Sequence, residues 1–563
     1  MKKPLPIGHE FYKRIIEKEL YYVDKTLLIK DILEKNTQVN LFTRPRRYGK
    51  TLTLSMLKTF FEQEMDVNGN IIDNSLYFEG MKIMDAGEEY TSKLGAYPVI
   101  SLSLKSGKQP NFEMAYLSIV DEISKEFKRH AYILKGNCLY DTEIAQYYSF
   151  IDKKASAVDC AKALEFLSYC LSKYHNQNVI ILIDEYDVPL ENSYFAGFYD
   201  EMIGFIRSLF ESALKTNNYL ELAVITGCLR VSKESIFTGL NNLEVISVLN
   251  NEYSEYFGFT QTEVEDMLKY YSLEHRLEEA KEWYNGYIFG ETQVYNPWSM
   301  INYVKTLCSD AKAFPKPYWS NTSSNSIVRE LIEAADDNTK QEIEGLIAGE
   351  SIEKPVHEEI TYGDIHVSMD NLWNFLFLTG YLKVTDKRFE ADTTYLTMKI
   401  PNREIKYIYR NTILEWFEQK LKKTDLSGLA NAFKEKDCAK LEDIITNQLI
   451  ETISFYDYAE SYYHGFLTGL LKACLGFITL SNRESGNGRP DVIMKTPSVR
   501  GIAIIMELKV VKDFDEMENA CMLALAQIEE QNYEAALYKE GYRNILKYGI
   551  CFYRKECMVR TIE

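Results

Sequence analysis

Two carboxylates and a lysine near the C-terminus have the types and spacing of a metal-dependent hydrolytic site. Glu507 and Lys509 are two residues apart in IAIIMELK, and Asp491 stands in GRPDVIM, with a Pro- and Gly-containing turn between the two runs. On a β-hairpin, residues two apart share one face, and Asp491 on the partner strand can face the same side. Asp491 and Glu507 can then hold Mg²⁺, while Lys509 stabilises or deprotonates the water that attacks a phosphodiester.

A second set of residues has the order of a phosphate-binding loop. The apolar run Val39–Thr43 leads into RPRRYGKT, residues 44–51, and then into a helical pattern. With Gly49 before the helix, backbone N–H groups and the positive helix end can face a phosphate. Lys50 is then placed for the β- and γ-oxygens and Thr51 for Mg²⁺. Arg44 stands where the usual loop pattern has its first glycine.

The arginines of this loop add to its positive charge. Arg44, Arg46 and Arg47 form a dense basic cluster with Lys50. The cluster can bind nucleotide phosphates, and we expect Arg46 and Arg47 to do so. The alternatives are a nucleic-acid backbone as the ligand, or a basic loop without any nucleotide.

Two further runs can complete a nucleotide site. VIILIDEYD, residues 179–187, ends a buried aliphatic run with two carboxylates. Asp184 can lie on the water shell of a magnesium ion, and Glu185 can polarise an attacking water. LAVITG, residues 222–227, ends in Thr226, which can sense the γ-phosphate from the neighbouring strand. The alternative for VIILIDEYD is a buried strand followed by an acidic turn.

Length and charge set the frame for these sites. The chain has 563 residues, of which 46% are hydrophobic and 26% charged, which is enough for about three to four domains and too apolar for disorder. Lys and Arg number 64 against 83 Asp and Glu, so the formal net charge is -19. This charge opposes indiscriminate binding to nucleic acid or anionic lipid, and any polyanion contact must be local.

The sequence does not predict export or membrane insertion. The first residues, MKKPLPIGHEFYKRI, lack an apolar run long enough for a signal peptide, and the longest aliphatic runs are strand-sized. None of the ten cysteines forms a CxxC pair or approaches a His at zinc-ligand spacing. We therefore expect a cytoplasmic protein with reduced thiols, no membrane contact and metal held by carboxylates.

The pattern of elements predicts an α/β multidomain protein with three segments. Residues 1–255 alternate strand-length apolar runs with helical patterns, which indicates a P-loop NTPase parallel sheet flanked by helices. Residues 256–440 form a mostly helical middle region with a small β element near residues 361–404. Residues 441–563 form a compact α/β domain. In the first segment, the five expected strands are residues 39–43, 98–103, 179–183, 222–226 and 244–248.

Residues 1 to about 320 resemble the AAA-ATPase-like domain of bacterial proteins. The resemblance rests on YYVDKT, RPRRYGKT, LIDEYD, ITGCLRVSKESIFTGLNNL, and WYNGY followed by VYNPWS. An Arg-rich loop replaces the glycine-rich one in that family, so Arg44 is typical of it. The resemblance implies ATP binding through GKT, with Asp184 and Glu185 as metal and water carboxylates. It also matches Arg230 to a family position near the sensor strand.

The C-terminal region resembles the PD-(D/E)xK nuclease superfamily, in particular a nuclease-like domain often fused to such an ATPase. This resemblance implies a restriction-endonuclease-like α/β fold with Asp491, Glu507 and Lys509 as the core triad. It implies that Gln527 is an accessory active-site group and that Glu460 can supply the acidic residue of the first helix. The matching stretches are ESYYHGFLTGLL, RESGNGRPDVIM, MELK and ALAQIEEQNY.

Two functions from different classes are compatible with these features. The first is an ATP-binding protein, an ATPase, coupled to a Mg²⁺-dependent nuclease that hydrolyses nucleic acid in DNA metabolism or defence. The second is an ATP-dependent switch whose C-terminal domain binds a partner or nucleic acid without cutting it. The intact triad favours the first, and the net charge of -19 favours the second. A homo-oligomer is compatible with both, and His464 is expected to be structural.

Overall fold

The computed structural model describes residues 2–562 apart from residues 67, 230–235, 238–239, 320–325, 357–367, 422–426, 452–459, 473, 475 and 482–488. Contacts within the chain divide it into two compact units. We call Met1–Asn321 with Glu353–Ile405 the N-terminal unit, and Thr322–Ile352 with Lys406–Glu563 the C-terminal unit. The three segments expected from the sequence, with limits at residues 255/256 and 440/441, stay a prediction beside this division.

The N-terminal unit is built on a five-stranded parallel sheet in the order β2-β3-β4-β1-β5. Every residue of β1 and β3 is buried, as the aliphatic runs predict for strands covered on both faces. The five strands expected from the sequence are confirmed. Their bounds are β1 (Val39–Thr43), β2 (Val99–Ser103), β3 (Val179–Asp184), β4 (Leu220–Gly227) and β5 (Leu243–Ile246).

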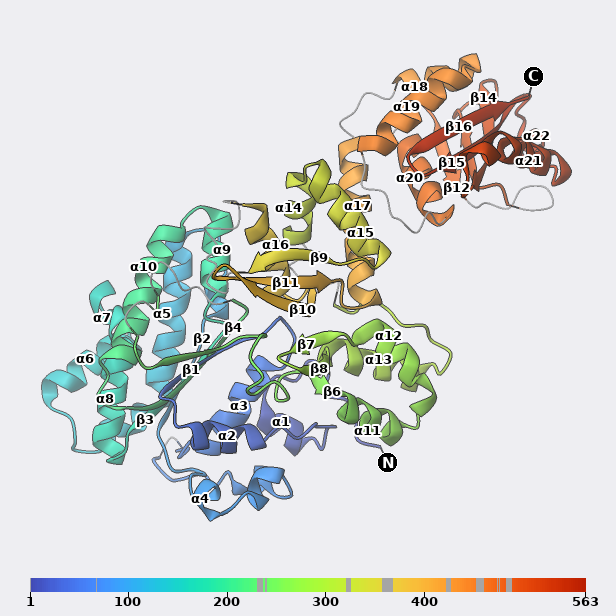
Figure 1. The fold of residues 1–563 in the computed structure, drawn as a ribbon. Coiled ribbons are helices and arrows are strands. Elements are labelled where there is room, and N and C mark those ends of the chain that lie inside the picture. The colour runs from blue at the N-terminus through green and yellow to red at the C-terminus, as the bar shows by residue number, and fades with distance from the viewer. Residues whose placement is uncertain are drawn as a thin grey trace. The chain divides into compact units, whose positions relative to one another are not determined.

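Helices cover both faces of this sheet (Figure 1). The helix that follows the phosphate-loop candidate, α3, packs on β2, β3 and β4, while α5 and α8 pack on β2 and β3 from the other face. The helix bounds in this part are α1 (Tyr12–Glu17), α2 (Leu27–Lys35), α3 (Lys50–Phe61), α4 (Glu88–Thr91), α5 (Phe112–Arg129), α6 (Asp141–Ile151), α7 (Ala157–Ala161), α8 (Ala163–His175), α9 (Val188–Ala196) and α10 (Tyr199–Phe210).

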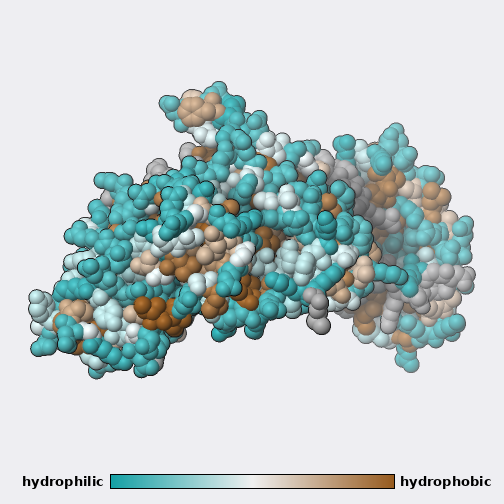
Figure 2. Space-filling model, turned by 90° about the horizontal axis from the view of Figure 1, so that it is seen from below, coloured by the Kyte–Doolittle hydropathy of each residue, from teal (hydrophilic) through white to brown (hydrophobic). Residues whose placement is uncertain are grey.

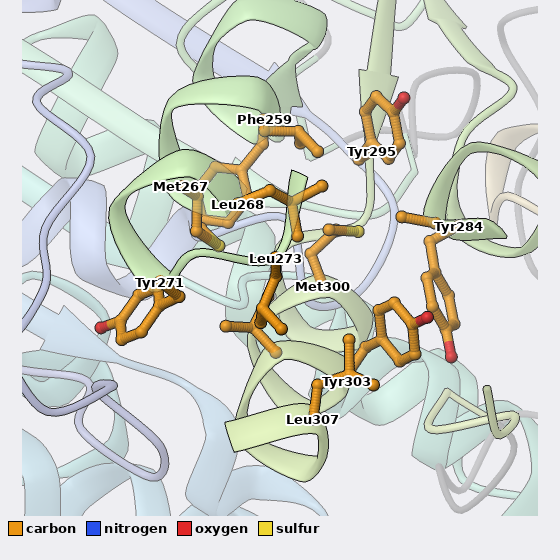
Figure 3. Close-up of a cluster of buried hydrophobic side chains, with 13 residues drawn as sticks. Phe259, Met267, Leu268, Tyr271, Leu273, Tyr284, Tyr295, Met300, Tyr303 and Leu307 are labelled. Carbon is orange, nitrogen blue, oxygen red and sulfur yellow. The ribbon is translucent and has the colours of Figure 1, made fainter. Parts of the chain in front are cut away.

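A smaller helical layer follows, with α11 (Gln261–Tyr271), α12 (Leu277–Tyr284) and α13 (Pro297–Ser309) around one apolar core. Figure 3 shows side chains from all three helices meeting in this core, among them Met267, Tyr284 and Tyr303. The helical middle is therefore confirmed. Its aromatic islands also hold a small antiparallel sheet of β6 (Phe259–Thr260), β8 (Thr292–Tyr295) and β7 (Tyr287–Phe289), which is too short to show a periodic pattern in the sequence.

The β element expected near residues 361–404 is present in the described part of that range. Strands β10 (Lys383–Glu390) and β11 (Thr393–Lys399) form an antiparallel hairpin, and β9 (Ile352–Val356) pairs with β11. Helix α16 (Met369–Leu378) precedes the hairpin. The remaining helices before the last sheet are α14 (Ser326–Ala334), α15 (Asp337–Ala348), α17 (Arg403–Leu421), α18 (Ser427–Glu435) and α19 (Cys438–Glu451).

The C-terminal unit holds a mixed sheet in the order β12-β13-β14-β15-β16. Only β14 and β15 are parallel to each other, because α21 and α22 connect them, and the predicted hairpin of β13 and β14 is confirmed. Helix α20 packs on β12, β13 and β14, and α21 packs on β14, β15 and β16. The bounds are α20 (Glu460–Lys472), β12 (Ile478–Ser481), β13 (Val492–Lys495), β14 (Ile502–Val510), α21 (Met517–Glu530), α22 (Glu534–Glu540), β15 (Asn544–Tyr553) and β16 (Glu556–Thr561).

The surface of the described residues is mixed in character. Figure 2 shows a face on which hydrophilic residues predominate and hydrophobic residues form separate patches. No helix in the described ranges is both long enough and apolar enough to cross a membrane. Single exposed apolar side chains such as Phe314 and Phe389 are normal on a folded surface.

Candidate functional site

The loop between β1 and α3 has the backbone of an anion-binding turn. Arg47 and Gly49 both adopt left-handed conformations, with φ of +67° and +86°. Gly49 caps α3 without any side-chain hydrogen bond to the first turn of the helix. The N–H groups of that turn can therefore meet an external acceptor, and the helix dipole favours a negative charge at this end.

Lys50 fills the hollow of this loop. Its ammonium group donates hydrogen bonds to the carbonyl oxygens of Arg44 at 2.8 Å and of Pro45 at 2.9 Å, and the side chain is buried. The Cys228 sulfur, just beyond β4, lies 3.5 Å from the same ammonium group. If a nucleotide bound to this loop, its β- and γ-phosphate oxygens would meet the Lys50 ammonium group.

The structure brings Thr51, Asp184 and Thr226 together from three elements. The Thr51 hydroxyl donates to one oxygen of the Asp184 carboxylate at 2.7 Å, and the Thr226 hydroxyl donates to the other oxygen at 2.6 Å. Thr226 is fully buried, so its geometry supports orientation of Asp184 rather than direct contact with a phosphate. The strand order makes this possible, because β4 lies between β1 and β3.

Glu185 and Asp187 follow β3 with different surroundings. Glu185 has a left-handed backbone, φ +51°, and its carboxylate makes no hydrogen bond or ion pair with another residue in the described part of the chain. Burial, and then the Asp184 charge, raise the pKa of Glu185, which makes it a stronger base. Asp187 is buried and accepts the backbone N–H groups of Cys228 and Leu229 at 2.7 and 3.1 Å. It therefore fixes the turn after β4.

Arg44 does not belong to the basic cluster that the sequence suggested. Its guanidinium is fully buried, donates to the Ile246 carbonyl at 2.8 Å and lies over the rings of Phe257 and Phe289 at 5.2 and 5.1 Å. Burial lowers the pKa of Arg44. Its backbone N–H also donates to the Gly227 carbonyl at 3.0 Å. Arg44 therefore ties β1 to the ends of β4 and β5.

Arg46 and Arg47 both have protein partners. Arg46 forms an ion pair with Glu191 of α9. The Arg47 guanidinium lies 4.0 Å from the ring centre of Trp298 on α13, and burial lowers its pKa. The Trp298 ring is therefore the surface on which Arg47 rests. A nucleotide phosphate would compete with these partners for both arginines.

The second candidate site lies on the hairpin of β13 and β14. Ile493 and Ile505 pair across the hairpin and pack with Leu525 and Ile528 of α21. Residues two apart on a strand share a face, so Glu507 and Lys509 lie on the α21 side, and Asp491 shares the side of Ile493. The sequence predicted this shared face, and the register supports it.

Hydrogen bonds connect the four residues of this site. Gln527 of α21 accepts from the Lys509 ammonium at 2.7 Å, and its amide NH₂ donates to Glu507, which is buried. Because an ammonium group only donates and a carboxylate only accepts, these two partners fix the orientation of the amide. The Asp491 carboxylate accepts the backbone N–H of Leu508 at 2.8 Å, and the Asp491 N–H lies 3.4 Å from a Glu507 oxygen.

The charges of this site fit a divalent cation. Burial, and then the charge of the Asp491 carboxylate, raise the pKa of Glu507 to about 7. The two carboxylates therefore repel each other when both are ionised. A cation between them would remove this repulsion. Among the described residues, no group of three or more His, Cys, Asp or Glu can enclose a metal ion. Mg²⁺ is commonly held by one or two carboxylates, water and substrate phosphate, and Asp491 and Glu507 can supply the two carboxylates of such a set.

Two residues suggested by family resemblance cannot be placed. Arg230 lies outside the described residues, and so does the side chain of Glu460, although its backbone begins α20. Sequence reasoning, for its part, did not assign Asp187, Glu191 or the contact of Trp298 with Arg47. The second aspartate of LIDEYD was a usable signal for Asp187. Nothing local in the sequence marks the other two, because their partners are distant along the chain.

Comparison with known proteins finds a family match over each of the two segments that hold the candidate sites. Residues 6–237 match the family described as predicted AAA-ATPase, and residues 458–562 match the PD-(D/E)XK nuclease superfamily. A protein of Azotobacter chroococcum mcd 1, described as an uncharacterized protein in the vnfD 5' region, is 26% identical over 575 residues, which cover 98% of this chain and 97% of that relative. The chain therefore joins an AAA-ATPase-like domain to a C-terminal domain of the PD-(D/E)XK nuclease superfamily.

Proposed function

We propose that the N-terminal unit binds and hydrolyses ATP with Mg²⁺. The observation that carries this is the hydrogen bond from Thr51 at the start of α3 to Asp184 at the end of β3, next to the Lys50 ammonium group that the loop carbonyls hold. Lys50 and the first N–H groups of α3 would bind the phosphates, and Thr51 and Asp184 would hold the ion. The ion supplies charge neutralisation between the phosphate oxygens. Glu185, which has no competing partner among the described residues, orients and deprotonates the attacking water.

We propose further that the C-terminal unit hydrolyses phosphodiester bonds in nucleic acid. The observation that carries this is the set of contacts that joins Lys509 to Glu507 through Gln527 beside Asp491. Asp491 and Glu507 would hold Mg²⁺, which would polarise the scissile phosphate. Lys509 stabilises the attacking hydroxide, and Gln527 keeps the lysine directed at that water. The formal net charge of -19 opposes general binding to a polyanion, so the substrate contact must be local.

The test is degradation of single- and double-stranded DNA and RNA by the full chain in Mg²⁺ or Mn²⁺, with and without ATP. Asp491→Ala and Lys50→Ala serve as matched variants. Cleavage by the wild type that is lost in Asp491→Ala supports the nuclease, and a response to ATP that is lost in Lys50→Ala supports coupling. If the wild type binds ATP, Lys50→Ala does not, and nothing is cleaved under any condition, the switch without nuclease activity becomes the better account.

A further inference from the structure

His464 contacts the proposed nuclease site from the face opposite to Gln527. Its Nε2 lies 2.9 Å from the backbone carbonyl oxygen of Asp491 and 3.1 Å from the Ser481 hydroxyl. A carbonyl oxygen only accepts hydrogen bonds, so Nε2 carries the hydrogen and donates a hydrogen bond to the Asp491 carbonyl oxygen. The ring therefore joins α20 to Asp491 immediately before β13.

The register places α20 and α21 on different faces of the sheet. Cys551 pairs with Lys509 and packs against α21, so the next residue, Phe552, faces the other side. Tyr463 of α20 stacks on Phe552, with ring centres 4.6 Å apart. Gln527 thus reaches the site from the α21 face, and His464 reaches it from the α20 face.

Three polar groups of Asp491 have partners within the site. The N–H faces Glu507, one carboxylate oxygen accepts from Leu508, and the carbonyl accepts from His464. Among the described residues, His464 is the partner that sets the peptide plane from outside the hairpin. Val492, the residue after Asp491, is fixed by its pairing with Ser481 of β12. A rotation of the peptide between Asp491 and Val492 would therefore move Asp491 and its carboxylate.

We infer that His464 is a positioning residue, which holds the Asp491 carboxylate in the geometry that binds a divalent cation. This inference rests on the proposed function of the C-terminal unit. Groups that orient metal ligands through hydrogen bonds typically change metal affinity or activity by about 10- to 100-fold when they are removed. A purely structural histidine would affect the stability of α20 and leave metal affinity unchanged.

The experiment measures Mn²⁺ binding to the full chain without nucleotide by electron paramagnetic resonance. The binding that Asp491→Ala removes defines the site. His464→Leu removes the donor, whereas His464→Gln keeps an N–H donor at a similar reach. Tyr463→Phe is the matched control, because it removes a 2.7 Å hydrogen bond from α20 to the Arg554 carbonyl without touching Asp491.

We expect His464→Leu to weaken Mn²⁺ binding by about tenfold or more, and His464→Gln to remain within about threefold of the wild type. Tyr463→Phe is expected to lower the melting temperature with no change in Mn²⁺ affinity. Unchanged affinity in His464→Leu, or an equal loss in Tyr463→Phe, would overturn the positioning role. Mn²⁺ binding that depends on His464 without any DNA or RNA cleavage would refute the nuclease and leave the positioning role standing. Equal binding by wild type and Asp491→Ala would refute both.

Discussion

The Thr51 hydroxyl donates a 2.7 Å hydrogen bond to the Asp184 carboxylate, although 133 positions separate the two residues in the chain. In an ATP complex with Mg²⁺, the same two oxygen groups would turn from each other to the ion. Asp184 supplies the negative charge for this exchange, and Thr226 holds its other oxygen at 2.6 Å. A substitution that removes the charge of Asp184 and keeps its size therefore tests whether this carboxylate binds the ion.

Asp184→Asn is expected to abolish the gain in ATP affinity that Mg²⁺ provides, because the amide keeps the size of the side chain but loses its charge. We expect wild-type affinity to rise about tenfold or more when Mg²⁺ is added and the variant to show almost no rise. Calorimetric titration with ATP, with and without Mg²⁺, measures this. Glu211→Gln, at an exposed helical position, is the control and should behave as the wild type. A full Mg²⁺ effect in Asp184→Asn would contradict the assignment.

Arg46→Gln and Glu191→Gln are expected to change ATP affinity in opposite directions. The two side chains form an ion pair, so Arg46 must leave Glu191 before it can reach a phosphate. Removing the arginine should weaken binding by about 3- to 30-fold, and removing the competing carboxylate should strengthen it by up to about fivefold. Fluorescence titration with a labelled ATP analogue measures both. Weaker binding in both variants would mean that the ion pair itself supports the loop.

Lys509→Met is expected to lower the cleavage rate by at least about 100-fold, and Gln527→Ala by about 10- to 100-fold. In the proposed reaction the lysine would stabilise the developing charge, whereas the glutamine would act by orienting Lys509 and Glu507, to which it is hydrogen-bonded. Initial rates on labelled DNA at saturating Mg²⁺ measure both losses. Gln531→Ala, at the C-cap that follows α21 four residues after Gln527, is the control. A wild-type rate in Gln527→Ala would remove Gln527 from the site.

Glu404 is expected to make the N-terminal unit less stable as the pH rises from about 4.5 to about 7. Glu404 is fully buried, and burial raises its pKa to about 7, although it accepts hydrogen bonds from Ser299 and the Trp319 N–H. The folded state therefore holds a proton that the unfolded state releases, and stability falls between the unfolded and folded pKa values.

Glu404→Gln tests this sign, because its amide is neutral at every pH. The free energy of unfolding of the wild type, relative to the variant, should fall by up to about 3 kcal/mol between pH 4.5 and pH 8. Urea unfolding at several pH values, followed by tryptophan fluorescence, measures the difference. A difference between the two proteins that does not vary with pH would show that Glu404 is not protonated in the folded state.

The sequence was sufficient for the elements that are determined locally. Strand-length, mostly apolar runs predicted all five strands of the parallel sheet, and the pattern is clearest for β1 and β3, which are buried on both faces. The turn and the spacing of Glu507 and Lys509 predicted the hairpin and its shared face. The short strands β7 and β8 were missed, since three or four residues carry no measurable period.

The partners of the loop arginines could not be predicted in the same way. The three arginines of the loop look alike in the sequence. In the structure, Arg44 is buried against two aromatic rings, whereas Arg46 pairs with Glu191. Arg47 rests on Trp298. These partners come from segments far along the chain, and only the tertiary structure brings them to the loop. The density of positive charge in the sequence predicted a single basic cluster, but in the folded protein the three arginines pack against different partners.

Arg44 also bears on how this loop can change in evolution. A glycine at this position would leave the Ile246 carbonyl without its donor and a space between the rings of Phe257 and Phe289. Reversion to the glycine-rich form would therefore need compensating changes in β5 and in the segments that carry these two rings. Arg44 is therefore coupled to the packing of the whole sheet edge, so a single substitution at this position would disturb several elements at once.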